Sequence, residues 1–178
     1  MRGRESEAID IVNEFFEVKG RFSASRPEGM AASTYTRDLA NYLAGVDEKL
    51  RSEVVGVLLQ SAMEGSNSLS AGSGHVCADL AIGGMRTAFA THINRVRNWF
   101  AKGIQTGWWR NDAGYESAPM EAKGFIHLMN VLWCCDREAA ERLSDTILAQ
   151  TTNEAVRESL TRSKFLPRVL DAMPPSDR

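Results

Sequence analysis

The sequence has little of what catalytic and membrane proteins usually display. Its 178 residues include only three His, three Cys and five Pro. No run approaches the ~20 apolar residues of a membrane span, and the first residues lack the apolar core of a signal peptide. The odd number of cysteines, two of them adjacent, shows no disulfide framework. These absences favour a reducing, cytoplasmic location, in a bacterial, viral or host cytosol that the sequence does not distinguish.

A run of alternating hydrophobic and polar residues, which would indicate a β-strand, is also missing. Hydrophobic residues instead recur at intervals of three and four, the spacing of one helix face. At 178 residues the chain is long enough to bury a core as one domain. We therefore predict a single helical domain over residues 1–178, an all-α bundle of six to eight helices.

The longest predicted helix, about residues 76–102, is expected to form the centre of the bundle. Its hydrophobic residues form a heptad-like seam: Ile82, Met85, Phe89, Ile93, Val96 and Phe100. Such a seam packs inside a bundle or between two copies, so a homo-oligomer is a further expectation. The preceding residues 65–75 are rich in Gly and Ser, whose ordering costs entropy, and are predicted to form a flexible loop.

Charge is distributed unevenly although the formal net charge is only -2. Residues 65–111 carry 5 Lys or Arg and 1 Asp or Glu, whereas residues 1–64 and residues 112–178 each carry 8 and 11. Within this region, residues 80–111 contain no acidic residue and three of the four tryptophans. A local field of one sign acts on a partner even when the whole molecule is nearly neutral.

This cationic, Trp-rich centre supplies the candidate binding residues: Arg86, Arg95, Arg97, Trp99, Lys102, Trp108, Trp109 and Arg110. Trp and Arg are frequent at hot spots of protein interfaces, which favours a protein partner. Arg also binds phosphate oxygens, and exposed indoles stack on bases, so a nucleic-acid partner stays open. The simplest alternative is a solvated helix face beside tryptophans of the core.

His75, Cys77 and Asp79 form a second group of reactive side chains. A helix N-terminus and a nearby imidazole favour a thiolate, which would give a nucleophile. Alternate residues at a helix start do not face one another, however. A small buried cysteine is therefore the preferred interpretation.

His127, Cys134 and Cys135 form a third group. A structural zinc site usually has four ligands, with paired cysteines separated by two to four residues, and direct adjacency does not fit that spacing. Buried apolar thiols are preferred here too. No metal and no cofactor is predicted.

The sequence thus favours a non-catalytic helical interaction protein that binds a macromolecular partner through residues 80–111, as an adaptor, an inhibitor or an assembly subunit. A nucleic-acid-binding subunit of a nucleoprotein assembly or coat is the first alternative. A small enzyme that uses His75 and Cys77 is the second. No membrane contact is expected. If Trp108 and Trp109 are buried and the cations diverge, this stretch is not a binding site.

Overall fold

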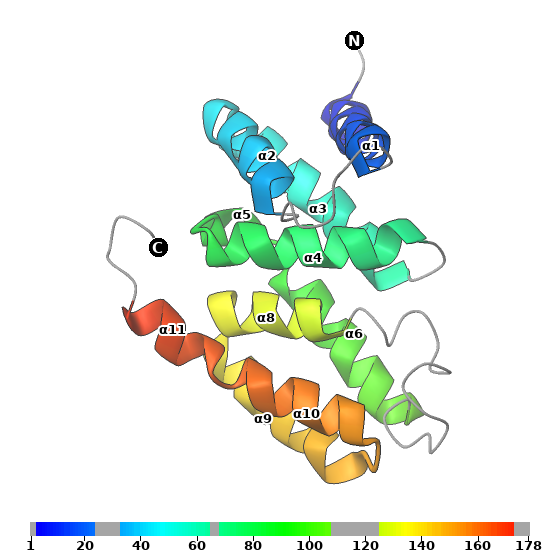
Figure 1. Ribbon diagram of the computed structural model, residues 1–178, viewed down its shortest axis with the longest axis vertical. Coiled ribbons are helices and arrows are strands. Elements are labelled where there is room, and N and C mark those ends of the chain that lie inside the picture. Colours follow the sequence, from blue (N-terminus) through cyan, green and yellow to red (C-terminus); the bar gives the residue numbers. More distant parts are fainter. Residues whose placement is uncertain (1–2, 24–32, 65–67, 108–124, 173–178) are drawn as a thin grey trace.

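The computed structural model describes residues 3–23, 33–64, 68–107 and 125–172, whose regular structure is helical throughout. The helices are α1 (Arg4–Ser23), α2 (Ser33–Gly45), α3 (Glu48–Glu64), α4 (Ser68–Ile82), α5 (Arg86–Phe89), α6 (Ile93–Thr106), α8 (Phe125–Cys135), α9 (Arg137–Gln150), α10 (Glu154–Ser163) and α11 (Leu166–Ala172). They are stacked in layers. In Figure 1, α1 and α2 lie at the top, α3 and α4 follow, then α8 with α6, and α9, α10 and α11 form the lower part. The predicted all-α bundle is confirmed.

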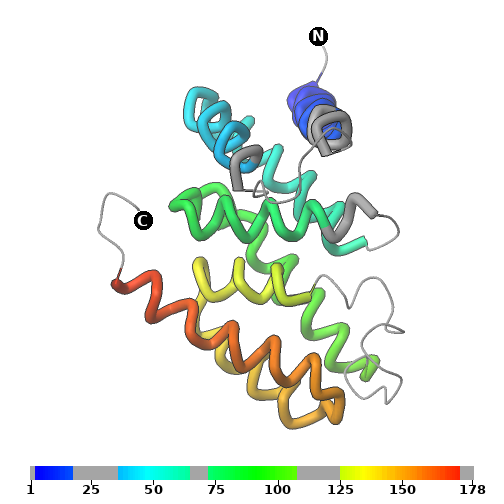
Figure 2. The backbone as a smooth tube through the Cα atoms, viewed as in Figure 1, coloured from blue at the N-terminus to red at the C-terminus, as the bar shows by residue number. Residues whose placement is uncertain are grey.

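The core lies in the middle of this stack, where α4 packs against α3 on one side and α8 on the other (Figure 2). Phe89, Phe100 and Phe125 are fully buried there. Full burial of one such side chain stabilises a fold by about 1.5–3 kcal/mol. None of the described helices has both the length and the hydrophobicity that crossing a membrane requires.

The prediction of one helix over residues 76–102 is wrong, because the segment is divided between α4, α5 and α6. The first break is a Schellman turn at the end of α4. The Gly84 N–H donates to the carbonyl of Ala81 at 3.3 Å, and the Met85 N–H donates to the carbonyl of Leu80 at 3.0 Å. Gly84 has a φ of 99°, a backbone angle that residues with a Cβ rarely adopt.

The second break, between α5 and α6, is held by contacts with α3. Thr91 Oγ1 lies 3.0 Å from Ser52 Oγ, and His92 Nε2 lies 2.9 Å from the Ser52 carbonyl oxygen. Residues 90–92 include neither glycine nor proline, the usual local stop signals. Tertiary contact therefore positions this break. α6 then continues past Gly103 and ends at Gly107, which has a φ of 76°.

The predicted hydrophobic seam is part of the core. Phe89, Ile93, Val96 and Phe100 are buried, and Ile82 and Met85 pack against the core while partly exposed. The four buried side chains contact the chain's own helices, so in this fold they are not free to join a second copy.

The predicted loop over residues 65–75 is wrong from Ser68 onward, where α4 begins; residues 65–67 lie outside the described ranges. Ser73 and Gly74 are buried. The Ser73 hydroxyl donates to Ser61 Oγ of α3 at 3.0 Å. Small residues let α4 approach α3 closely, and this packing outweighs the low helix propensity of Gly and Ser.

Candidate interaction surfaces

The described cations of residues 80–111 lie on different sides of the bundle. Arg95 and Lys102 are exposed on α6. Arg97 forms an ion pair with Asp136 at the start of α9. Arg86 is half-buried, and no described residue accepts a hydrogen bond from its Nε or Nη2. Arg97 therefore faces α9, whereas Arg95 donates to Gln60 of α3, so these two guanidiniums do not share a surface.

Trp99 is held by the core. Its Nε1 donates to the carbonyl of Met63 at 3.0 Å, and its ring meets Phe100 edge-on with 5.1 Å between centroids. Trp108, Trp109 and Arg110 lie outside the described residues. Among the residues described, the predicted centre thus does not form one compact site.

His75, Asp79 and His127 meet where α4 packs against α8. His75 Nε2 lies 3.5 Å from Asp79 Oδ2, and the two imidazole rings are 5.1 Å apart between centroids. Burial lowers the pKa of His127, the charge on His75 lowers it further, and Asp79 opposes both effects. No cluster of three His, Cys, Asp or Glu that could hold a metal ion occurs within the described part of the chain.

The three cysteines are free thiols. Cys77 is fully buried, and that burial raises the pKa of its thiol. Burial also raises the pKa of Cys134 to about 11 and that of Cys135 to about 12. A thiol that stays protonated near neutral pH is a poor nucleophile, so this environment does not support a reactive Cys77.

An open groove of about 520 Å³ lies between α1, α3 and the start of α6, and we name it the acidic groove. It is lined by Glu5 and Ile9 of α1, by Glu53, Gly56, Val57, Gln60, Ser61 and Glu64 of α3, and by His92 and Arg95. Ile9 is a large hydrophobic residue with 41% of its surface exposed. Three carboxylates and one guanidinium therefore surround an exposed apolar side chain.

The floor of the acidic groove is the contact between His92 and Gly56. A Cβ at position 56 would lie 2.8 Å from Cε1 and 3.1 Å from Nε2 of His92. The ring is held by Ser52, whose carbonyl oxygen lies 2.9 Å and whose Oγ lies 3.2 Å from Nε2. Glycine thus leaves the room that the imidazole occupies.

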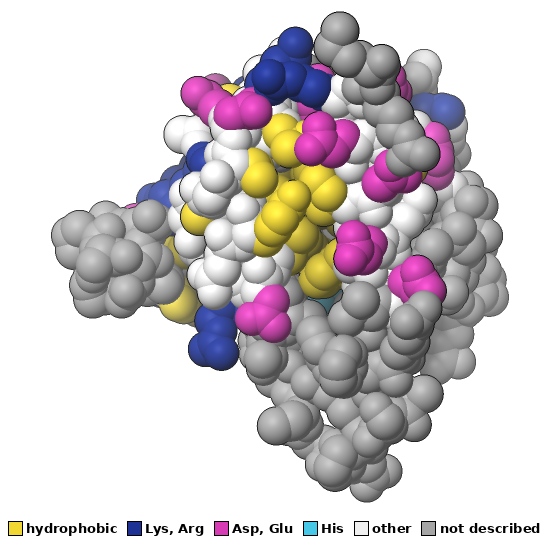
Figure 3. Space-filling model, turned by 90° about the horizontal axis from the view of Figure 1, so that it is seen from above, with side chains coloured by type: hydrophobic (Ala, Val, Ile, Leu, Met, Phe, Trp, Pro, Cys, Tyr) yellow, Lys and Arg dark blue, Asp and Glu magenta, His cyan; other side chains and the backbone are white. Residues whose placement is uncertain are grey.

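The carboxylates of the acidic groove differ in their partners. Glu64 accepts a hydrogen bond from Gln60 Nε2, and Gln60 Oε1 accepts one from Arg95. Glu5 and Glu53 have no ion-pair partner among the described residues. α1 adds to the negative field, because residues 4–17 contain five Asp or Glu, all exposed, and one Arg. Seen from above, a band of hydrophobic side chains runs between Asp and Glu side chains (Figure 3).

A second exposed apolar surface, the α11 patch, consists of Phe165, Leu166, Val169 and Ile126 around a recess of about 450 Å³. Phe165 and Val169 are 55% and 56% exposed. The Arg168 guanidinium lies 5.7 Å from the centre of the Phe165 ring. No carboxylate lines the described part of this recess, and no described carboxylate pairs with Arg168. The patch is therefore apolar and basic.

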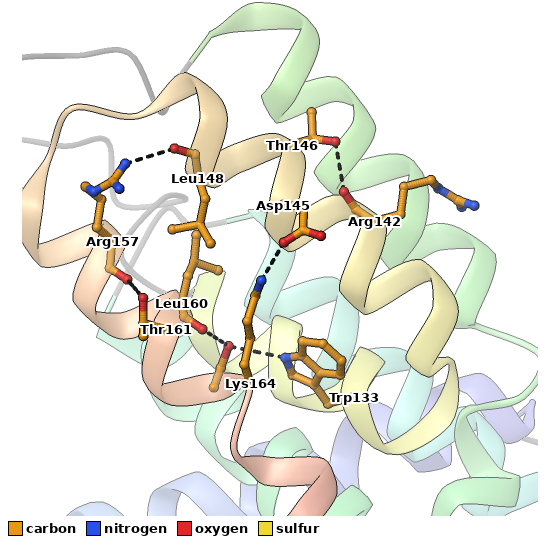
Figure 4. A network of polar contacts seen from close by, with 10 residues as sticks. Trp133, Arg142, Asp145, Thr146, Leu148, Arg157, Leu160, Thr161 and Lys164 are labelled. Carbon is orange, nitrogen blue, oxygen red and sulfur yellow. Dashed lines mark hydrogen bonds and ion pairs between the residues drawn. The ribbon is translucent and has the colours of Figure 1, made fainter.

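Buried hydrogen bonds fix the base of the α11 patch. Trp133 Nε1 of α8 donates to Ser163 Oγ at 3.2 Å, and that hydroxyl donates to the Leu160 carbonyl at 2.7 Å. Lys164 forms an ion pair with Asp145 of α9. Figure 4 shows the Lys164 side chain directed toward the Asp145 carboxylate, and the Trp133 indole nitrogen directed toward the end of α10. Phe165 follows Lys164 directly, so its exposed position is anchored.

Sequence reasoning missed both surfaces. The available signals were the acidic run over residues 4–17 and the four-residue spacing of Phe165 and Val169. Neither signal shows which helices meet to form a groove. No family model, no curated protein and no solved structure matches the chain. The two surfaces are therefore the main evidence on function.

Proposed function

We propose that this protein is a non-catalytic helical interaction protein whose acidic groove binds a basic, apolar segment of a macromolecular partner. The observation that carries the proposal is the exposure of Ile9 in a groove that also holds Glu5 and Glu53, two carboxylates without a described ion-pair partner. An exposed apolar side chain among carboxylates suits a segment that combines hydrophobic residues with Lys or Arg.

Hydrophobic burial would supply most of the affinity of such a contact. Removing apolar surface such as Ile9 and Val57 from water contributes about 25 cal/mol per Å². The carboxylates would mainly increase the association rate and select the sign of the partner's charge. At physiological ionic strength this attraction is screened beyond about 8 Å. We therefore expect binding that weakens as salt is added.

Arg95 connects the acidic groove to the cationic centre predicted from the sequence. It lines the groove and donates to Gln60, which in turn donates to Glu64. This chain of hydrogen bonds holds a guanidinium at the edge of an otherwise acidic surface. The Arg95 guanidinium would donate a hydrogen bond to a backbone carbonyl of the partner and would thereby orient the bound segment.

The proposal is tested with a fluorescein-labelled synthetic amphipathic peptide of leucine and lysine, followed by fluorescence anisotropy. The unmodified protein should bind it, and Glu53→Lys should weaken binding about tenfold, equivalent to ~1.4 kcal/mol. The matched control is Glu141→Lys, which makes the same charge change at an exposed position of α9 outside the groove. Equal binding by both variants would contradict the proposal, as would equal binding of a leucine–glutamate peptide.

A nucleic-acid partner is the second candidate, and it is favoured by the exposure of Arg95 and Lys102 on α6, a helix without acidic residues. Neutralised phosphates make such binding steeply dependent on salt. A labelled single-stranded oligonucleotide tests this alternative in the same assay. Retention that Arg95→Glu and Lys102→Glu abolish, and that Glu53→Lys leaves unchanged, would replace the protein partner by a nucleic acid.

A further inference from the structure

The acidic groove and the α11 patch have opposite charge, and each exposes large hydrophobic side chains. The groove exposes Ile9 beside Glu5 and Glu53, whereas the patch exposes Phe165 and Val169 beside Arg168. Glu5 and Glu53 of the groove have no ion-pair partner among the described residues, and neither does Arg168 of the patch. Each surface thus has the composition that the other would select in a partner.

We propose that the partner of the acidic groove is the α11 patch of a second copy of this chain. This assignment rests on the proposed function and names its occupant. Phe165 and Val169 of one copy would cover Ile9 and Val57 of the next, and the Arg168 guanidinium would meet the carboxylates of Glu5 and Glu53. Burial of the exposed apolar side chains and pairing of the charges then occur in the same contact.

The positions of the two surfaces determine what kind of assembly follows. The groove belongs to α1, α3 and the start of α6, and the patch belongs to α8, α10 and α11. Figure 1 shows α1 at the top and α11 in the lower part, with α4 between them. One molecule can therefore use both surfaces at once. A contact between two different surfaces is head-to-tail, and it forms a ring or an open filament rather than a two-fold dimer.

The first experiment is sedimentation velocity of the full chain over a range of concentrations at low and high salt. The average mass should rise with concentration at about 50 mM salt and fall toward one chain at about 500 mM, because screening weakens the charge pairing. A single species of monomer mass at every concentration in low salt would overturn the proposal.

The second experiment separates the two surfaces by mixing variants. Glu53→Lys blocks the groove and keeps the patch, whereas Phe165→Ser removes the exposed ring of the patch and keeps the groove. Each variant alone should remain monomeric at concentrations up to about tenfold above those at which the unmodified chain assembles. An equimolar mixture should form a heterodimer and grow no further, because one groove and one patch remain intact and can meet once. Circular dichroism and thermal unfolding verify that both variants fold.

Self-association that neither variant reduces, or a mixture that stays monomeric while the unmodified chain assembles, would assign assembly to other surfaces and overturn the proposal. The leucine–lysine peptide distinguishes this failure from failure of the proposed function. If the chain is monomeric and its groove binds the peptide, the second copy is not the partner and the proposed interaction function stands. If the chain is monomeric and does not bind the peptide, both proposals are wrong.

Discussion

Replacing Gly56 by alanine is expected to destabilise the protein, although glycine is a poor residue for the interior of α3. The new Cβ would lie 2.8 Å from His92 Cε1, closer than non-bonded carbon atoms approach. The imidazole would have to move, and movement would break its hydrogen bond to the Ser52 carbonyl at 2.9 Å. The same displacement would disturb the floor of the acidic groove.

The magnitude follows from two opposing effects. Alanine is favoured over glycine inside a helix by about 1 kcal/mol. Overpacking against His92 costs about 1–3 kcal/mol, and the lost hydrogen bond to Ser52 costs about 0.5–1.5 kcal/mol. We expect Gly56→Ala to lower the free energy of unfolding by about 0.5–3.5 kcal/mol, which is the sum of the two costs less the gain in helix propensity. In a His92→Ala background the imidazole is absent, and Gly56→Ala should raise the free energy of unfolding by about 1 kcal/mol.

The assay is urea unfolding of the four proteins of this double-mutant cycle, followed by circular dichroism. The coupling energy between positions 56 and 92 should equal the overpacking and hydrogen-bond costs together, about 1.5–4.5 kcal/mol. Gly45→Ala is a matched control, because a Cβ at that end of α2 meets nothing within 4 Å. It should change stability by less than about 0.5 kcal/mol.

Equal effects of Gly56→Ala in both backgrounds, within about 0.5 kcal/mol, would refute the reasoning. That result would mean that His92 does not restrict position 56. The groove floor would then have a different shape from the one described, and the peptide-binding test would lose its structural basis.

Three further predictions concern the core and its edges. The pKa of His127 is lowered in the folded chain from the ordinary 6.5, so near that pH the unfolded chain binds more protons than the folded chain. The free energy of unfolding should therefore fall as the pH decreases through 6.5. His127→Gln should reduce this loss, measured by urea unfolding. Asp136→Ala should lower the free energy of unfolding by about 1–2 kcal/mol, because Asp136 is the N-cap of α9 and its Oδ1 accepts a hydrogen bond from the Ala139 N–H at 3.2 Å. Arg97→Gln removes the ion pair but keeps the cap, so it should cost less than about 1 kcal/mol. The buried Cys77 should react with a thiol reagent at neutral pH only after unfolding, so its native modification rate should rise with urea.

The exposed ion pairs are not expected to decide stability. Arg137 pairs with Asp171, and this contact with its hydrogen bonds raises the pKa of the guanidinium. Both side chains are about half exposed, at 47% and 59%. Exposed pairs contribute about 0–1 kcal/mol. The buried helix contacts in the layers of α3, α4 and α8 therefore determine whether the chain folds.

Local sequence patterns are sufficient to predict the fold class and those features of the structure that depend on neighbouring residues. Hydrophobic spacing of three and four predicted the all-α bundle, and the same spacing occurs in the buried face of α8, with Phe125, Leu128 and Leu132. Asp47 and Asp136 each stand directly before a helix, and each accepts a hydrogen bond from a backbone N–H three residues later. These features are readable because helix periodicity and capping act within one or two turns.

Packing between helices sets where the central segment breaks and makes the Gly/Ser-rich residues from Ser68 onward helical. It also brings side chains that are distant in the sequence onto one surface. The break before α6 depends on Ser52, which is 40 residues away from His92. Ser73 is helical because Ser61 and α3 pack against it. The acidic groove exists because Glu5, Glu53 and Arg95, distant in the sequence, come from helices that pack together. Local sequence patterns carry no information on such tertiary contacts, because these contacts are set by the packing of the whole bundle.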